Sequence, residues 1–254
     1  MSCNLRGLSV LVTRPSEQAD ALCELIEQAR GRPVRLPVLE ILPPRDPEAA
    51  GRLLQEAAKA DLLIFVSANA VRHAFPLLPD MLPAGLSIAA VGRATARALE
   101  EAGLEPTLVP AGRFDSEGLL ALPELGKMEQ KRVIIVRGEG GRERLRRTLE
   151  ERGARVDYAE VYRRSCVRRN TANLVASWEA MVQAVTVTSV GILECLWDLL
   201  DERGKSLLRD THLVVLSERI ADRARDLGCR RVVVTKQAGE RAILRALCKL
   251  AEES

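Results

Sequence analysis

The sequence predicts an α/β protein with two flavodoxin-like parallel-sheet domains. Three observations support this fold class. Short apolar segments alternate with amphipathic helical segments along all 254 residues. The apolar segments do not alternate with polar residues, so each is expected to be a strand buried on both faces, as in parallel sheets. Several of these segments also recur, in matching pairs, further along the chain.

In the first half of the chain, apolar segments are followed by a turn and then by a helix. Strands are expected at 8–13, 62–66, 87–91 and, as a short strand, 106–109. Helices are expected from Ser16, as N-cap, to about residue 30, and at 46–60, 69–76, 94–102 and 116–122. Gly31 is expected to end the first helix at its C′ position. Residues 33–42 are expected to be extended, interrupted at Pro37 and before Pro43.

The second half repeats this pattern. Strands or extended segments are expected at 132–136, 156–162, 185–188, 213–216 and 231–235. Helices are expected between them, near 145–153, 171–178, 190–200 and 220–227, and one more at the end of the chain. Four basic residues follow the extended segment 156–162, and they are interpreted as a solvated face of a linker: Arg163, Arg164, Arg168 and Arg169.

The order of the repeated segments predicts that one domain is inserted into the other. Residues 10–31 match 134–153, residues 61–71 match 185–193, and residues 90–103 match 215–228. The N-terminal strand and helix, residues 10–31, are therefore expected to pack with the C-terminal set of strands and helices. This predicts one domain at 1–36 plus 167–254, an inserted domain at 44–157, and linkers 37–43 and 158–166 that form a two-stranded ladder. The alternative is two sequential domains split near residue 125.

Composition excludes several classes of protein. Aromatic residues make up 3% of the chain and the net charge is +3, which disfavours nucleic-acid and membrane binding but suits an anionic metabolite. No segment is long and apolar enough to cross a membrane, and the N-terminus does not resemble a signal peptide. Two histidines make a metal site improbable. The cysteines form no C-x-x-C pair, so free thiols in a reducing cytoplasm are expected for Cys3, Cys23, Cys166, Cys195, Cys229 and Cys248.

The turns after the predicted strands are rich in Gly, Ser and Arg, and each opens a helix. Ligands of open parallel sheets bind beyond the carboxyl ends of the strands, where helix N-termini attract anions. Turns of two facing domains would line one cleft. An ordinary N-cap role explains Ser67, Asn69 and Ser189 equally well. The predicted substrate-binding residues are Arg14, Ser67, Ala68, Asn69, Gly92, Arg93, Thr95, Arg137, Gly138, Ser189, Val190, Ser217 and Arg219.

Over its whole length the chain resembles the uroporphyrinogen-III synthase family. The matching segments are 12–15 (VTRP), 65–71 (FVSANAV), 90–96 (AVGRATA), 116–120 (SEGLL), 136–141 (VRGEGG), 159–164 (AEVYRR) and 188–189 (TS). The resemblance implies a cofactor-free hydro-lyase of heme biosynthesis that cyclises hydroxymethylbilane, inverts its last ring and releases water. It also implies two α/β domains joined by a two-stranded ladder.

The resemblance assigns roles to particular residues. Tyr162 matches a tyrosine proposed to assist departure of the substrate hydroxyl, while Thr95, Ser67 and Ser189 match residues that line the family's cleft. Many members have Gly-Pro-Thr where this chain has residues 217–219 (SER), so Arg219 is expected to bind a substrate carboxylate there. A cytoplasmic monomer is expected, with possible transient contact to the enzyme that makes the substrate. The alternative function is a two-domain protein that binds an anionic metabolite without transforming it.

Overall fold

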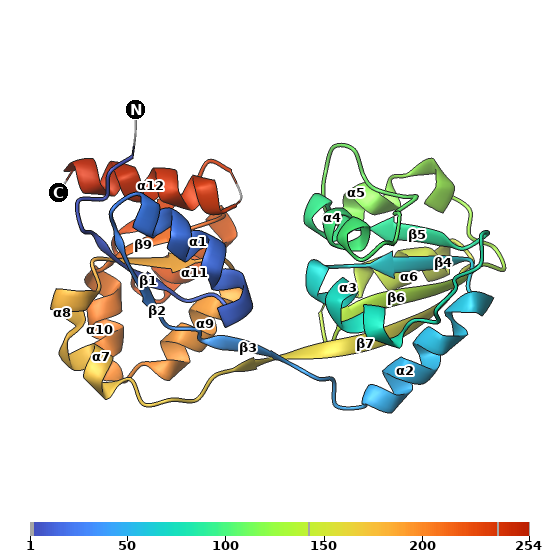
Figure 1. The fold of residues 1–254 in the computed structure, drawn as a ribbon, viewed down its shortest axis with the longest axis horizontal. Coiled ribbons are helices and arrows are strands. Elements are labelled where there is room, and N and C mark those ends of the chain that lie inside the picture. The colour runs from blue at the N-terminus through green and yellow to red at the C-terminus, as the bar shows by residue number, and fades with distance from the viewer. Residues whose placement is uncertain (1–2, 142, 238, 254) are drawn as a thin grey trace. The chain divides into compact units, whose positions relative to one another are not determined.

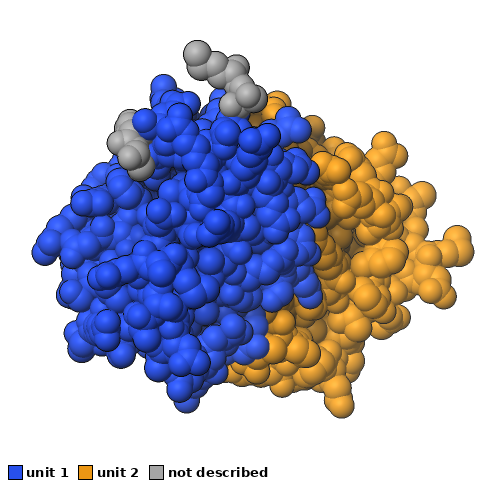
Figure 2. All heavy atoms as spheres, turned by 60° about the vertical axis from the view of Figure 1, so that its left-hand side comes forward, with its two compact units in different colours: residues 1–40, 165–254 blue, residues 41–164 orange. Residues whose placement is uncertain are grey.

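The computed structural model describes residues 3–141, 143–237 and 239–253. The chain divides into two compact units, coloured separately in Figure 2. Unit 1 comprises Met1–Glu40 and Ser165–Ser254, and unit 2 comprises Ile41–Arg164. Each unit contains one five-stranded sheet.

The sheet of unit 1 has the strand order β10-β9-β8-β1-β2, and each of its pairings is parallel. Counted along the chain within the unit, this is the flavodoxin order 2-1-3-4-5. Because β1 pairs with β8, the alternative of two sequential domains split near residue 125 is wrong. The strands are β1 (Ser9–Val12), β2 (Arg32–Arg35), β8 (Ala184–Val187), β9 (His212–Val215) and β10 (Val232–Val234).

Helices cover the sheet of unit 1. α1 and α12 lie side by side, and their apolar residues share one core with β1 (Figure 1). α9 and α11 contact each other, and each also contacts a strand of the sheet. The helices are α1 (Ser16–Gln28), α7 (Ala172–Ala176), α8 (Trp178–Met181), α9 (Val190–Leu199), α10 (Glu202–Asp210), α11 (Glu218–Asp226) and α12 (Glu240–Glu253).

The second sheet has the order β3-β7-β6-β4-β5, with parallel pairing among β7, β6, β4 and β5. The two parallel sheets confirm the predicted fold class. β3 lies next to β7, so the two segments that connect the units are neighbours in one sheet, as expected for a two-stranded ladder. The strands are β3 (Leu39–Leu42), β4 (Leu62–Phe65), β5 (Ser87–Ala90), β6 (Arg132–Gly138) and β7 (Arg155–Cys166).

Both faces of the second sheet are buried. Leu63 and Phe65 of β4 face a core formed with α2, α3 and α4, whereas Leu62 and Ile64 face a core formed with α5 and α6. This is why the strand sequences are continuously apolar. The helices are α2 (Pro47–Gln55), α3 (Ala68–Ala74), α4 (Arg93–Glu101), α5 (Ser116–Leu120) and α6 (Arg144–Glu151), with 3₁₀ turns η1 (Glu56–Lys59), η2 (Phe75–Leu77) and η3 (Pro123–Leu125).

Four local predictions are wrong, and one helix was not predicted. Pro15 rather than Ser16 is the N-cap of α1, and Arg30 (φ 61°) rather than Gly31 takes the left-handed conformation after the helix. Residues 106–109 form an isolated bridge from Leu108 to Ala89 and not a strand. The helix expected at 171–178 is broken at Ser177 into α7 and α8, and α10 is not among the predicted helices.

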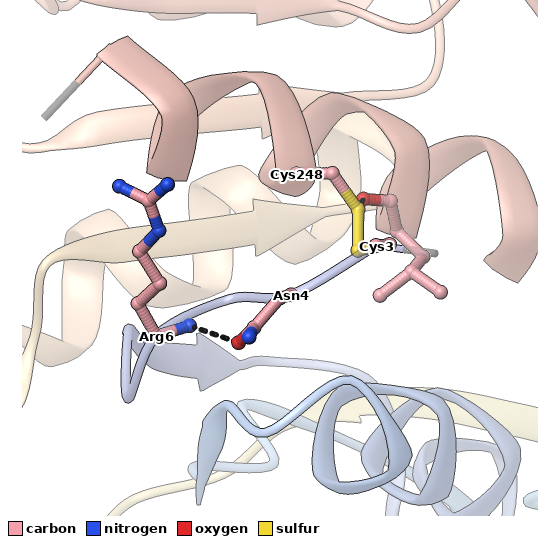
Figure 3. Close-up of a disulfide and its surroundings, with 5 residues drawn as sticks. Cys3, Asn4, Arg6 and Cys248 are labelled. Carbon is pink, nitrogen blue, oxygen red and sulfur yellow. Dashed lines mark hydrogen bonds between the residues drawn. A yellow bond between two sulfur atoms is a disulfide. The ribbon is translucent and has the colours of Figure 1, made fainter. Parts of the chain in front are cut away.

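The prediction of free thiols is wrong for four of the six cysteines. Cys3 and Cys248 form a disulfide that joins the N-terminal segment to α12 (Figure 3). Cys166, the last residue of β7, forms a second disulfide with Cys195 of α9. Folding brings these partners together across 245 and 29 residues, so their spacing in the sequence carries no sign of pairing. Cys23 and Cys229 are free and buried.

Within the described residues, no helix combines the length and apolarity that a membrane span requires.

Candidate active site

The phenol of Tyr162 is at the centre of a group of polar side chains at the carboxyl edge of the sheet in unit 2. Tyr162 lies near the end of β7, and its Oη is 3.1 Å from Oγ of Ser67, which follows β4. Ser67 Oγ also accepts a hydrogen bond of 3.1 Å from the backbone N–H of Ala70, as the N-cap of α3. The N-cap prediction for Ser67 is confirmed, and the same side chain contacts Tyr162.

A β-bulge sets the direction of Tyr162. In the β6–β7 pairing, Arg137 is opposite Glu160, but Gly138 is opposite Tyr162, so β7 has one extra residue at this point. Consecutive residues of a strand normally point to opposite faces, yet Val161 and Tyr162 both belong to the core beneath α3 and α4. The bulge therefore turns the tyrosine ring toward Ser67.

Gly138 leaves room for the tyrosine ring. A Cβ at position 138 would be 2.6 Å from both Cε2 and Cζ of Tyr162, closer than real Cβ contacts occur. The backbone N–H of Glu139 donates a 2.7 Å hydrogen bond to the carbonyl of Tyr162 and fixes the strand beside the glycine. On another side, His73 of α3 stacks on the tyrosine ring with centroids 5.6 Å apart. The ring is thus held by its neighbours, and Tyr162 is 2% exposed.

A hollow of about 250 Å³ adjoins this group and is lined by Tyr162, Tyr158, Arg164 and the loop 138–141, among others. It is smaller than the pockets of roughly 300–1,000 Å³ that enclose drug-sized ligands. A hollow of this size fits one ring of a larger substrate better than it fits the whole substrate.

Arg137 is buried next to the same hollow, and its guanidinium is already paired. Its Nε donates to the carbonyl of Gly138 (3.1 Å), and its Nη1 donates to Glu143 (3.2 Å). The guanidinium also lies 4.3 Å from the ring centroid of Tyr158, whose hydroxyl donates to Glu143 (2.9 Å). Burial and this hydrogen bond raise the pKa of Tyr158 to about 12. Hydrogen bonds from Tyr158 and Arg137 lower the pKa of Glu143. The network joins Glu143, the N-cap residue of α6, to β6 and β7.

The other predicted residues of unit 2 lie at the start of α4 and of α3, and they differ in exposure. Gly92 is the N-cap of α4 in an extended conformation (φ −159°) that any residue can adopt. Arg93 is exposed, with its guanidinium 4.3 Å from the ring centroid of Phe114. Thr95 is 5% exposed, so the side chain predicted to contact substrate is buried. Ala68 and Asn69 occupy the first turn of α3, directly after Ser67.

Unit 1 has a corresponding set of turns at the carboxyl ends of its strands. Arg14 follows β1, and its Nη1 donates a 2.5 Å hydrogen bond to Glu240 at the start of α12. This contact lowers the pKa of Glu240. Nε of Arg14 is buried and has no hydrogen-bond partner within the described residues. A bound anion would give this guanidinium a second acceptor.

The other predicted residues of unit 1 lie at two helix N-termini. Ser189 caps α9 by accepting a 3.2 Å hydrogen bond from the N–H of Ile192, and Val190 is the first residue of that helix. Ser217 is the N-cap residue of α11 without a side-chain cap bond, and Arg219 is exposed in the first turn.

In the part of the chain that the structure describes, no cluster of three or more His, Cys, Asp or Glu side chains could hold a metal ion.

A family model described as uroporphyrinogen-III synthase HemD matches residues 20–245. The chain belongs to the uroporphyrinogen-III synthase family. It is 35% identical over 252 residues to the uroporphyrinogen-III synthase of Escherichia coli K12, covering 94% of this chain and 100% of that protein. It is also 35% identical to the uroporphyrinogen-III synthase of Salmonella typhimurium LT2, over 246 residues that cover 94% and 100% of the two chains.

Solved structures of this synthase family share the fold. A mutant uroporphyrinogen III synthase from the extremely thermophilic bacterium Thermus thermophilus superposes with a TM-score of 0.66 at 22% identity, covering 98% of this chain and 100% of that chain. The uroporphyrinogen-III synthetase of Helicobacter pylori 26695 has a TM-score of 0.62 at 15% identity, covering 96% and 99%. At these identities the two structures support the fold.

Two residues that contact Tyr162 were not among the site residues predicted from the sequence. Arg164 donates a 3.3 Å hydrogen bond from Nη2 to the phenol oxygen, and His73 stacks on the ring. A signal for Arg164 was present in the sequence. It is two residues beyond Tyr162 in an extended segment, and residues i and i+2 of a strand share a face. Nothing local to His73 marks its contact with a residue of a distant strand.

Proposed function

We propose that this protein is a uroporphyrinogen-III synthase that converts hydroxymethylbilane to uroporphyrinogen III with release of water. The observation that carries the proposal is the phenol of Tyr162, held between Ser67 and Arg164 beside a hollow sized for one ring. Family membership supplies the reaction class. The site supplies a sheltered proton donor with cationic neighbours.

The reaction requires little from side chains beyond one proton donor. Electrons of the first pyrrole ring expel the hydroxyl group, the C–O bond breaks, and the proton of Tyr162 converts the leaving group to water. The resulting azafulvene is attacked by the substituted carbon of the last ring, giving a spiro intermediate that reopens and closes inverted. Rearomatisation releases a proton, which restores the phenol. Each proton that the protein donates is therefore returned.

Positioning is the larger part of the task, since uncatalysed closure gives the non-inverted isomer. Holding the reacting carbons together can lower a barrier by roughly 7–11 kcal/mol at best. The substrate has eight carboxylates, so cationic and N-terminal groups suit it. We propose that Arg14, Ser189, Val190, Ser217 and Arg219 of unit 1 contribute to holding the substrate, as do Ser67, Ala68, Asn69, Gly92, Arg93, Thr95, Arg137 and Gly138 of unit 2.

The experiment supplies hydroxymethylbilane, generated in place, to the purified protein, then oxidises the products and resolves the type I and type III isomers. A large excess of type III over the no-protein control is expected. Tyr162→Phe is expected to lower the rate of type III formation while leaving the thermal unfolding temperature close to that of wild type. An isomer ratio equal to the control contradicts the proposed function and favours a protein that binds an anionic metabolite without transforming it.

We also propose that the protein acts in the cytoplasm as a monomer and contacts the enzyme that makes its unstable substrate only transiently. Family membership supports the cytoplasmic location. The two disulfides, however, are unusual for a reducing compartment. Thiol labelling of cell fractions, with and without prior reduction, reports both the location and the state of the cysteines. Sedimentation of the purified protein reports its oligomeric state.

A further inference from the structure

The hydrogen bonds around the phenol oxygen of Tyr162 determine where its proton can point. We infer that Arg164 is a positioning residue which, together with Ser67, leaves the phenolic proton of Tyr162 free for the departing hydroxyl group. This inference rests on the proposed function, and it extends that function to two side chains next to the proton donor.

The argument begins with a count of donors and acceptors. A phenol oxygen carries one proton and can accept two hydrogen bonds, whereas a guanidinium can only donate. The 3.3 Å contact from Nη2 of Arg164 therefore occupies one acceptor position of Tyr162. The phenol cannot donate its own proton to Arg164. Its proton is left with two possible destinations, which are Ser67 and a group in the adjoining hollow.

Ser67 can fill the second acceptor position. Its Oγ already accepts from the N–H of Ala70, and it still has its own proton to donate across the 3.1 Å contact to Tyr162. With Arg164 and Ser67 both donating, the two acceptor positions of the phenol are occupied. The proton of Tyr162 must then find an acceptor outside this group, and the leaving hydroxyl group of the substrate is such an acceptor.

The charge of Arg164 acts in the same direction. As the proton leaves Tyr162, negative charge develops on the phenol oxygen, and a cation hydrogen-bonded to that oxygen stabilises it. The guanidinium carbon lies 5.8 Å from the tyrosine ring centroid. None of the ion pairs found among the described residues involves Arg164, in contrast to Arg137, which pairs with Glu143. No carboxylate of residues 3–141, 143–237 or 239–253 therefore offsets the positive charge of Arg164 in an ion pair.

The strand provides a matched control. Tyr162 and Arg164 are two residues apart in β7, so their side chains leave the same face, while Arg163 between them points to the other. Replacing either arginine by glutamine removes one positive charge from the same strand. Only the change at Arg164 removes the cationic donor to Tyr162.

The experiment compares kcat and KM for type III formation in Arg164→Gln, Arg164→Lys and Arg163→Gln. Arg164→Gln is expected to lower kcat about tenfold, the low end for a charged hydrogen bond because the contact is long and Arg164 is exposed. KM should change little, Arg164→Lys should recover part of the loss, and Arg163→Gln should match wild type. In a Tyr162→Phe background, Arg164→Gln should cause no further loss of kcat.

Three results would overturn the inference while leaving the proposed function intact. The first is equal kcat for Arg164→Gln and Arg163→Gln. The second is a full tenfold loss that persists in the Tyr162→Phe background, which would mean that Arg164 acts independently of the phenol. The third is a rise in KM at constant kcat, which would make Arg164 a binding residue for a substrate carboxylate. A wild-type protein that forms no excess of type III contradicts the proposed function itself, and the inference with it.

Discussion

Replacing Gly138 by alanine tests whether the position of the Tyr162 phenol matters for the reaction. The added Cβ would be 2.6 Å from Cε2 and Cζ of Tyr162, whereas ordinary contact begins at 3.4 Å, so the ring must retreat by 3.4 − 2.6 = 0.8 Å. A retreat of that size directly away from Ser67 would lengthen the 3.1 Å contact to 3.1 + 0.8 = 3.9 Å, beyond hydrogen-bond distance. Gly138 does not have a positive φ, so alanine meets no backbone strain there.

Two effects of Gly138→Ala should be separable. Overpacking is expected to lower the free energy of unfolding by about 1–3 kcal/mol. Displacement of the phenol is expected to lower kcat by about 10- to 100-fold, since misplacement by about 1 Å can cost about 100-fold. Isomer-resolved kinetics measure the second effect and urea unfolding measures the first.

A glycine in a helix of the same unit is the control. Apart from its chain neighbours and the backbone of α2 itself, no heavy atom of the described residues lies within 4 Å of a Cβ built at Gly51. Gly51→Ala should therefore leave kcat unchanged and raise stability by about 0.5–1 kcal/mol. In a Tyr162→Phe background, Gly138→Ala should still destabilise the protein but lose its effect on kcat. Wild-type kcat in folded Gly138→Ala would refute the reasoning, because the phenol position would then not matter.

Three further predictions concern stability. Cys3→Ser should lower thermal stability in the absence of reductant, by about 2–4 kcal/mol, because the disulfide to Cys248 links residues 245 apart; dithiothreitol should then affect the variant less than wild type, and equal sensitivity would count against a formed disulfide. The hydrogen bond from Arg14 lowers the pKa of Glu240 from 4.5, so this pairing stabilises the fold above that pH and is lost as pH falls through the lower folded value; Glu240→Gln should flatten the acid limb of stability, as followed by urea unfolding between pH 3 and 7. The pKa of Tyr158 is raised from 10.0 to about 12, so its contribution is complete below pH 10 and is lost between about 10 and 12; Tyr158→Phe should remove this alkaline loss, and an identical alkaline limb would show that Tyr158 does not cause it.

The fold was predictable because its main signal is local. A strand buried on both faces needs apolar residues at consecutive positions. Leu62–Phe65 has them, and its side chains point alternately into two separate cores. The segment Glu202–Asp210 lacked such a signal. It buries only Gly204 and Leu208, and its other positions are mostly charged, so α10 resembles a solvated connection. Pairing across long distances, as between Cys3 and Cys248, is absent from any local pattern.

The candidate site was predictable in part. The turn after each strand identifies Ser67, because ligands of parallel sheets bind at that edge. The contact of Ser67 with Tyr162 depends on the bulge opposite Gly138, which shifts the register by one residue. Hydrophobic periodicity does not resolve such a shift. A run of arginines in a linker resembles a solvated surface, and that resemblance hid the contact between Arg164 and the phenol.

The insertion of unit 2 between the two parts of unit 1 has a consequence for synthesis on the ribosome. Residues 41–164 are contiguous, so unit 2 can fold as soon as it emerges. In contrast, β1 pairs with β8, and the hydroxyl of Thr13, the residue after β1, donates to the carbonyl of Thr186, 173 positions later. At 5–20 residues per second, the first strands remain without that partner for roughly 9–35 s. During that interval the apolar residues of β1 and α1 are exposed to chaperones and to neighbouring chains. We therefore expect loss of protein during production to result from early exposure of the N-terminal segment, and not from instability of the folded protein.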